Sequence, residues 1–144
     1  MIGGKREGGS RKREGESGAL APRVLIVMPD QWTRALLRAS LREVGYDAVG
    51  TRTLQSAMRI RVNEPDRAPL ALIIIDQAAV DDLRAVQALL ERHHAQAMLI
   101  ARQTTATPAG PWQRVVYRPI SVEEIVRVVE DFLPLSAERR HPLD

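Results

Sequence analysis

The sequence contains no cysteine and very few aromatic residues. Without cysteine the chain can form no disulfide framework, no thiolate zinc site and no cysteine nucleophile. Only 3% of the residues are Phe, Trp or Tyr, so Leu, Ile, Val and Ala must build any hydrophobic core. The longest apolar runs, residues 24–28 and 70–75, are much shorter than the roughly 20 residues of a membrane-spanning helix. No apolar stretch follows the basic N-terminus soon enough to indicate a signal peptide, and we expect a cytoplasmic protein that does not enter a membrane.

What the sequence does contain suits one globular domain. A chain of 144 residues with 44% hydrophobic content can build one core and is too short for two ordinary domains. Composition divides it into a tail at residues 1–22, a domain at residues 23–133 and a polar C-terminal tail at residues 134–144. The first tail holds six of the nine glycines. We expect it to be disordered, because it has little apolar surface to bury.

The Lys and Arg residues of tail 1–22 leave two interpretations open. They could contact nucleic acid or an acidic lipid surface, and the first would make the protein a nucleic-acid-associated adaptor. Interleaved glutamates and the lack of aromatic side chains in the tail argue against nucleic acid, because single strands are bound largely by stacking. A solvated tail is the simpler interpretation.

Short apolar runs alternate with stretches of helical spacing throughout residues 23–133. The runs predict strands at residues 23–28, 46–51, 70–75, 97–101 and 114–117. Hydrophobic residues spaced by three or four predict helices at residues 31–44, 53–62, 80–93 and 121–133. The last helix is the clearest, because Ser121 and Glu124 can form a capping box and Ile120 and Ile125 a hydrophobic staple. The residues expected to face the core are Leu37, Leu41, Val44, Leu54, Ala57, Met58, Leu83, Val86, Leu90, Ile125, Val129, Phe132 and Leu133.

This alternation predicts an α/β fold with a parallel sheet and helices on both faces, because each crossover must be right-handed. Five strands in this length suit the flavodoxin-like, doubly wound order 2-1-3-4-5. Residues 103–113 are rich in Thr, Pro, Ala and Gly, so the fourth helix of that fold should be shortened or missing. Ligands of such sheets bind at the carboxyl ends of strands 1 and 3. In this sequence those ends are Met28-Pro29-Asp30 and Asp76.

Charged residues follow two of the predicted strands. Asp76 ends the run Leu-Ile-Ile-Ile, and Arg118-Pro119 follows the last strand. Along the chain these two motifs alternate with apolar strands: residues 24–27, then Asp76, then residues 98–101, then Arg118-Pro119. This order resembles the receiver domains of two-component response regulators. The resemblance covers residues 23–133.

The resemblance implies a phosphoacceptor, and it places the acceptor at Asp76. In that family an acidic pair after the first strand holds Mg²⁺ together with the acceptor, but the pair falls here on Met28 and Pro29. Neither offers the hard oxygen ligand that Mg²⁺ requires. A Mg²⁺ site would need Asp30, the next residue, to lend its carboxylate beside Asp76.

Two other implied positions also differ. The family's hydroxyl after the fourth strand falls on Ala101, which has no donor. Its lysine after the fifth strand is replaced by Arg118, which keeps the charge but not the compact ammonium. Without a metal to offset the repulsion between carboxylate and phosphoryl donor, we expect slow phosphorylation or none. An ion pair between Asp76 and Arg118 should then keep Asp76 ionised, either as part of a switch or merely to satisfy a buried charge.

The sequence therefore predicts a stand-alone, receiver-like signalling module that is not an enzyme. It would act by contact with a signalling protein or by forming a homodimer, with no resident cofactor. The alternative is a working phosphoacceptor, in which a histidine kinase phosphorylates Asp76 and Asp30 helps to hold Mg²⁺. Trp112, in the segment that lacks the fourth helix, is either an anchor for a partner or a cover for the edge of the sheet.

Overall fold

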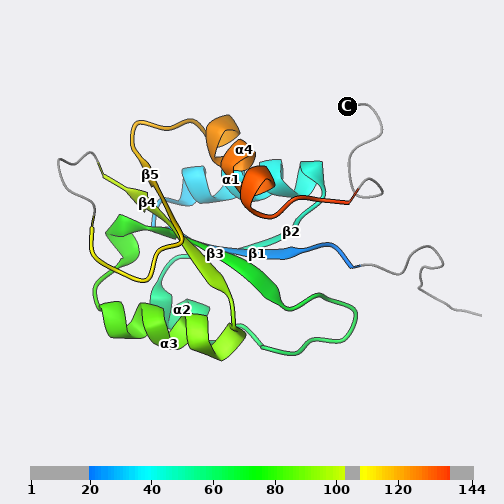
Figure 1. The fold of residues 1–144 in the computed structure, drawn as a ribbon, viewed down its shortest axis with the longest axis horizontal. Coiled ribbons are helices and arrows are strands. Elements are labelled where there is room, and N and C mark those ends of the chain that lie inside the picture. Colours follow the sequence, from blue (N-terminus) through cyan, green and yellow to red (C-terminus); the bar gives the residue numbers. More distant parts are fainter. Residues whose placement is uncertain (1–19, 103–107, 137–144) are drawn as a thin grey trace, which may run out of the picture.

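A computed structural model describes residues 20–102 and 108–136 of the chain. The predictions for most of tail 1–22 and of tail 134–144 fall outside these residues. Five strands form one parallel sheet in the predicted order, β2-β1-β3-β4-β5 (Figure 1). They are β1 (Arg23–Val27), β2 (Asp47–Thr51), β3 (Leu70–Asp76), β4 (Gln96–Ala101) and β5 (Arg114–Tyr117).

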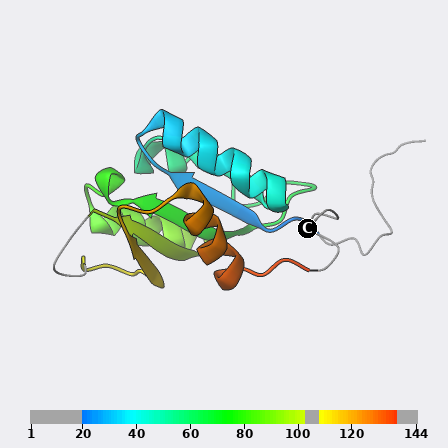
Figure 2. The ribbon, with the colours of Figure 1, turned by 90° about the horizontal axis from the view of Figure 1, so that it is seen from above.

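Four α-helices cover the two faces of the sheet within the described ranges. They are α1 (Gln31–Val44), α2 (Leu54–Ala57), α3 (Leu83–His93) and α4 (Val122–Phe132). Helices α1 and α4 lie side by side on one face, and α2 and α3 lie on the other (Figures 1 and 2). No helix in the described part of the chain is long and apolar enough to cross a membrane.

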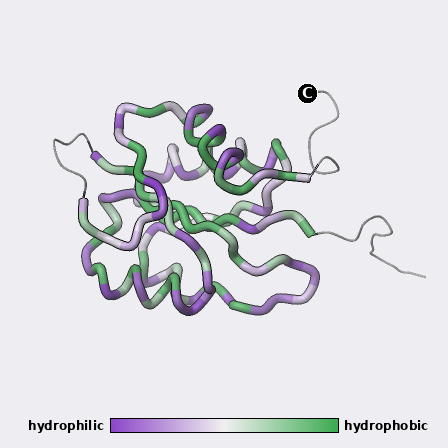
Figure 3. Tube along the Cα trace, viewed as in Figure 1, coloured by the Kyte–Doolittle hydropathy of each residue, from purple (hydrophilic) through white to green (hydrophobic). Residues whose placement is uncertain are grey.

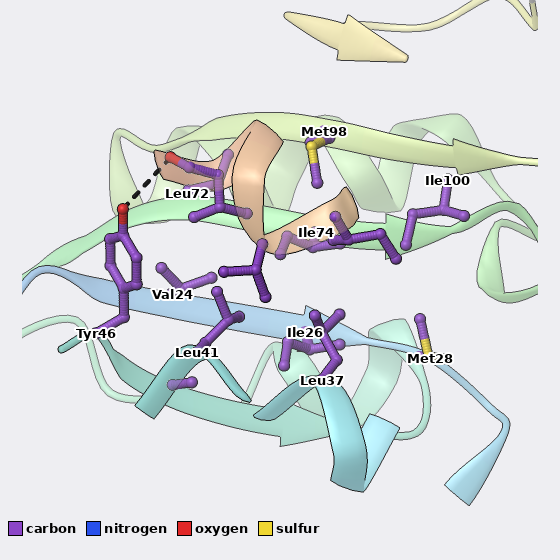
Figure 4. Packing of buried hydrophobic residues seen from close by; sticks show 14 of the residues in the cluster. Val24, Ile26, Met28, Leu37, Leu41, Tyr46, Leu72, Ile74, Met98 and Ile100 are labelled. Carbon is purple, nitrogen blue, oxygen red and sulfur yellow. Dashed lines mark hydrogen bonds between the residues drawn. The ribbon is translucent and has the colours of Figure 1, made fainter. Parts of the chain in front are cut away.

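Alternate residues of the strands build two hydrophobic layers, one on each face of the sheet. Val24, Ile26 and Met28 face α1 and α4, where they pack with side chains such as Leu37 and Leu41 (Figure 4). The intervening strand residues pack with α2 and α3 on the other face. The central strands are accordingly largely hydrophobic (Figure 3), as expected for strands covered on both faces.

The ends of α1 and α4 follow the sequence signals. Asp30 caps α1 by accepting a hydrogen bond from the backbone N–H of Thr33 at 3.0 Å, and Gly45 ends the helix with φ 123°. The capping box of α4 is complete, since the Ser121 and Glu124 side chains each accept from the other's backbone N–H, at 3.1 and 2.8 Å. The predicted boundaries of both helices are confirmed to within one residue.

The prediction for the second helix was wrong in length. Thr53 caps it as expected, but the helix ends at Ala57 rather than near residue 62. Tight hydrogen bonds from Arg59 to Ser56 and from Ile60 to Ala57 close its last turn. The following loop is held instead by Arg67, which bonds both oxygens of Asp47 at 2.8 and 2.9 Å. These contacts join the loop to the start of β2.

The prediction for the third helix was wrong at its start. Gln77–Ala79 forms a separate 3₁₀ turn, η2, and α3 begins at Leu83 with Asp82 as its N-cap. Leu83, expected in the core, is 41% exposed because it lies in the first turn. The buried stripe is instead Val86, Leu89 and His93.

The connection between β4 and β5 differs from an ordinary crossover. Its described parts, Arg102 and residues 108–113, contain no helix, which agrees with the predicted loss or shortening of the fourth helix. Trp112 lies partly buried against the hydrophobic layer of α2 and α3. A Cβ atom on Gly110 would overlap its indole ring, so this glycine is required for the tryptophan to lie where it does.

Candidate functional site

Asp76 is the last residue of β3 and is only 5% exposed. One carboxylate oxygen, Oδ1, accepts a hydrogen bond from the backbone N–H of Ala78 at 3.2 Å and so caps η2. The other, Oδ2, accepts from Arg118 Nη2 at 3.0 Å. Both oxygens of this buried carboxylate are therefore already engaged, as a buried charge requires.

Arg118 reaches Asp76 because of the register of the sheet. Asp76 pairs with Ile100, and Ala101 pairs with Tyr117, so the carboxyl ends of β3, β4 and β5 meet. The Arg118 backbone N–H donates to the Ala101 carbonyl at 2.9 Å, and the Arg118–Pro119 peptide bond is cis. Ala101 is fully buried and contributes no polar side-chain atom. The Arg118 side chain is 38% exposed.

Asp30 lies at the same edge of the sheet but is engaged elsewhere. The Thr33 hydroxyl and the Thr33 backbone N–H both donate to its Oδ2. These two hydrogen bonds hold the pKa of Asp30 below its ordinary value, with smaller contributions from the charges of Arg118 and Arg34. Asp30 thus lies within electrostatic reach of Arg118 while its carboxylate serves as the cap of α1.

The end of β1 is held by Arg34, whose contact there no sequence pattern predicts. Arg34 Nη1 donates to the carbonyl of Met28 at 2.6 Å and approaches that of Pro29 at 3.4 Å. The Met28 side chain is fully buried in the hydrophobic layer. Nothing in residues 28 and 29 presents a carboxylate, and a guanidinium lies on their backbone oxygens.

The donor groups fit Mg²⁺ poorly, although the receiver resemblance implies such an ion. Among the described residues, the carboxylates of Asp30 and Asp76 lie at this edge, and both accept hydrogen bonds from the protein. Within the described residues no three His, Cys, Asp or Glu side chains lie close enough to hold a metal together. Arg118 already supplies a positive charge directly to Asp76.

A shallow opening lies beside the ion pair. Arg102, Arg118, Pro119 and Ile120 line a space of about 610 Å³. The Gln77 side chain accepts from the Arg102 backbone N–H at 2.8 Å and ties η2 to the end of β4. This link joins the two segments at the position where Ala101 has no hydroxyl to offer.

The two tryptophans differ sharply in exposure. Trp112, the candidate anchor from the sequence, is partly buried and borders a space of about 210 Å³ together with Val80, Leu83 and Leu99. Trp32, which the sequence analysis did not single out, is 85% exposed on α1. Its position in the first turn, next to the Asp30 cap, was the only signal that could have marked it as a surface residue.

Comparison with known proteins identifies structures with a similar fold. No family model matches the sequence, and no curated protein is significantly similar to it. Among solved structures, a response regulator from Thermotoga maritima aligns with a TM-score of 0.62 at 13% identity, over 81% of this chain and 100% of that one. A CheY-like receiver domain from Methylobacillus flagellatus aligns with a TM-score of 0.62 at 13% identity, over 77% and 98%. An adenylate cyclase structure from Rhodopirellula baltica gives 0.64 at 16%, over 78% and 87%.

The five-stranded sheet, its order and the helices on both faces define a doubly wound, flavodoxin-like protein. Within that class the chain has the fold of response-regulator receiver domains. The predicted receiver architecture is thereby confirmed.

Proposed function

We propose that this protein is a receiver-like signalling module in which Arg118, rather than a metal ion, neutralises Asp76. It acts through contact with a signalling protein or with a second copy of itself, and its phosphorylation on Asp76 is slow or absent. The observation that carries the proposal is the ion pair between Asp76 Oδ2 and Arg118 Nη2 at 3.0 Å.

The chemistry of phosphoryl transfer supports this proposal. Transfer depends on positioning and on neutralisation of charge around the attacking and leaving oxygens. The attacking oxygen would be one of the two Asp76 oxygens, and each already accepts a hydrogen bond. An arginine beside the acceptor offsets part of the charge, but Asp30 is engaged by Thr33 and is poorly placed to complete a metal site.

The alternative is a working phosphoacceptor that a histidine kinase phosphorylates on Asp76. One observation favours it: the Arg118 side chain is 38% exposed and borders an opening of about 610 Å³. A phosphoryl donor could approach there if Arg118 turned away from Asp76. The guanidinium would then bind the phosphoryl oxygens, as arginine does in many phosphate sites.

Incubation with acetyl phosphate and Mg²⁺, followed by intact-mass measurement, tests the two against each other. We expect no phosphate adduct within minutes, and no difference between the protein and its Asp76→Asn variant. An adduct that forms within minutes and is absent from Asp76→Asn would contradict the proposal and establish the alternative. Arg118→Lys serves as a second probe, because it restores the compact ammonium while leaving a positive charge beside Asp76.

The nucleic-acid adaptor is a third candidate, and it rests on residues 1–22, most of which lie outside the described residues. It predicts that deletion of residues 1–22 abolishes retention on nucleic acid at low salt, where phosphate contacts are strongest. Equal retention of the full chain and the deletion variant would remove it.

A further inference from the structure

A row of arginines lies on the side of α1 that faces β2. Arg34, Arg38 and Arg42 follow one another at intervals of four residues, so they lie on one face and are about 6 Å apart along the helix axis. The first two border a groove of about 480 Å³ between α1 and β2. The residues lining this groove are Gln31, Arg34, Ala35, Arg38, Val49 and Gly50.

Backbone carbonyls fix both guanidinium groups that border the groove. Arg34 Nη1 donates to the Met28 carbonyl at 2.6 Å, and Arg38 Nε donates to the Ala48 carbonyl at 3.3 Å. A guanidinium carries five N–H groups, so each arginine keeps several donors for another acceptor. Because each side chain is already held by at least one hydrogen bond, binding a ligand would cost less of the usual entropy of immobilising it.

These arginines make no ion pair with a carboxylate in the described part of the chain, although Asp30 and Asp47 lie within electrostatic range of Arg34 and Arg42. Among residues 20–102 and 108–136, none of the three forms an ion pair, whereas Arg23, Arg67, Arg84 and Arg118 do. Asp30, at the N-terminal end of the row, accepts its hydrogen bonds from Thr33, and the charge of Arg34 contributes to lowering its pKa. The groove is therefore a fixed site of positive charge.

Gly50 keeps the groove open. A Cβ atom at this position would lie 3.1 Å from Cγ and 3.2 Å from Cδ of Arg34. These distances are tight, so a side chain there would press on the Arg34 stem and occupy the space between α1 and β2. The absence of a side chain at residue 50 thus preserves both the groove and the position of Arg34.

From these features we infer that the groove between α1 and β2 binds an acidic segment of a partner protein. Paired N–H groups of arginine match the two oxygens of a carboxylate. Glutamates at every fourth position of a helix repeat at about 6 Å, and those at alternate positions of an extended strand repeat at about 6.6 Å. Either spacing matches the arginine row.

Nucleic acid fits this surface less well than an acidic peptide does. The row is narrow, because Glu43 follows Arg42 directly and Asp47 begins the adjoining strand. On the other side of α1 lies α4, whose exposed residues include Glu123, Glu124 and Asp131. A broad duplex would bring its phosphates towards these carboxylates, whereas a peptide can stay within the groove.

This inference rests on the proposed role in protein–protein contact, but it uses neither Asp76 nor Arg118. The probe is a fluorescein-labelled peptide in which Glu alternates with Ser, and its control has Gln in place of Glu. Binding is followed by fluorescence anisotropy at low salt. We expect the Glu peptide to bind and the Gln peptide to bind at least about tenfold more weakly, with the difference falling as salt is added.

Three variants locate the site. Arg38→Glu should weaken binding of the Glu peptide by about tenfold or more. Gly50→Leu should weaken it similarly without any change of charge, because it fills the groove. Arg127→Glu, an equal charge change on the exposed side of α4, should leave binding within about twofold of the parent, as should Asp76→Asn. Thermal unfolding of each variant shows that it is folded.

Several results would overturn the inference. One is that the parent protein does not bind the Glu peptide, and another is that Arg38→Glu and Arg127→Glu weaken that binding equally. Unchanged binding of the peptide by folded Gly50→Leu would also contradict the inference. If the protein bound duplex DNA more tightly than the Glu peptide, and Arg38→Glu abolished the DNA binding, the arginine row would be a nucleic-acid site instead. Failure of the peptide test leaves the acetyl phosphate result untouched, because Asp76→Asn is scored separately in each experiment.

Discussion

Arg34 and Met28 are joined by a hydrogen bond of 2.6 Å from the guanidinium Nη1 to the backbone carbonyl. The bond connects the second turn of α1 to the end of β1 and fixes the loop between them. That loop positions Asp30, which caps the helix, and it lies at the carboxyl edge of the sheet where Asp76 and Arg118 meet. Several measurable consequences follow from this arrangement and from the ion pair beside it.

Replacing Arg34 should destabilise the fold. In Arg34→Ala the Met28 carbonyl loses its charged donor, which should lower the free energy of unfolding by about 1–3 kcal/mol. Urea denaturation measures the change. Arg42→Ala is the matched control, because no hydrogen bond or ion pair of that side chain is seen within the described residues, and it should stay within about 0.5 kcal/mol. Equal effects of the two changes would show that the contact with Met28 contributes nothing.

The Asp76–Arg118 pair should behave as one unit. Arg118→Ala leaves a buried carboxylate without its cation and should lower the free energy of unfolding at neutral pH by about 1–3 kcal/mol. Exposure of Arg118 to solvent places the value towards the lower end. Asp76→Asn combined with Arg118→Ala should cost clearly less than the sum of the single changes, because the uncompensated charge is gone. Strict additivity in the double-mutant cycle would mean that the two side chains do not interact.

His93 should make the protein less stable in mild acid. Burial lowers the pKa of His93 below its ordinary 6.5, and the charges of Arg92 and Arg23 lower it further. The folded state therefore resists protonation, while the unfolded state binds a proton once the pH falls below about 6.5. Stability is complete above that pH and decreases below it, by at most about 1.4 kcal/mol per pH unit.

Urea denaturation between pH 8 and pH 5 measures this effect. In His93→Leu, which places an apolar side chain at the same buried position, the loss between about pH 6.5 and pH 5 should shrink. His94→Asn is the control, because residue 94 is exposed and has the left-handed conformation that Asn tolerates. If the parent and His93→Leu lose stability in parallel, another group is responsible.

The two tryptophans should contribute unequally to the free energy of unfolding. Trp112→Ala removes a side chain packed against the α2–α3 layer and should cost about 2–4 kcal/mol. Trp32→Ala removes an indole that is 85% exposed, and the free energy of unfolding should change by less than about 0.5 kcal/mol. Thermal or urea unfolding separates them. A large cost at Trp32, or none at Trp112, would reverse this assignment.

The sequence predicts the sheet well because its strands are buried on both faces. Residues 24–27 and 70–75 form continuous apolar runs that suit no exposed element, and right-handed crossovers then leave few possible strand orders. The meeting of Asp76 with Arg118 follows from the same reasoning, since the ends of parallel strands share one edge. The ends of α1 and α4 can be predicted equally well, because their capping residues are local sequence signals.

Other features depend on contacts between distant segments, which periodicity does not record. The helical pattern continues past Ala57, yet the helix ends there, and Arg67 in the following loop pairs with Asp47 and Glu64. His93 has the pattern of a solvent-facing helix end but is only 4% exposed. The contact of Arg34 with the Met28 carbonyl depends on the shape of the intervening loop, so no rule of residue spacing predicts it.

The Tyr46 hydroxyl donates to the Leu133 carbonyl at 2.6 Å. This bond pins the exit of α4 beside the start of β2, at the amino edge of the sheet, where β1 also begins (Figure 1). Both described ends of the domain therefore lie across the sheet from Asp76 and Arg118. An affinity tag, fluorophore or fused protein joined directly at residue 20 or residue 136 would therefore leave the domain at that far edge, and the ion pair would stay accessible.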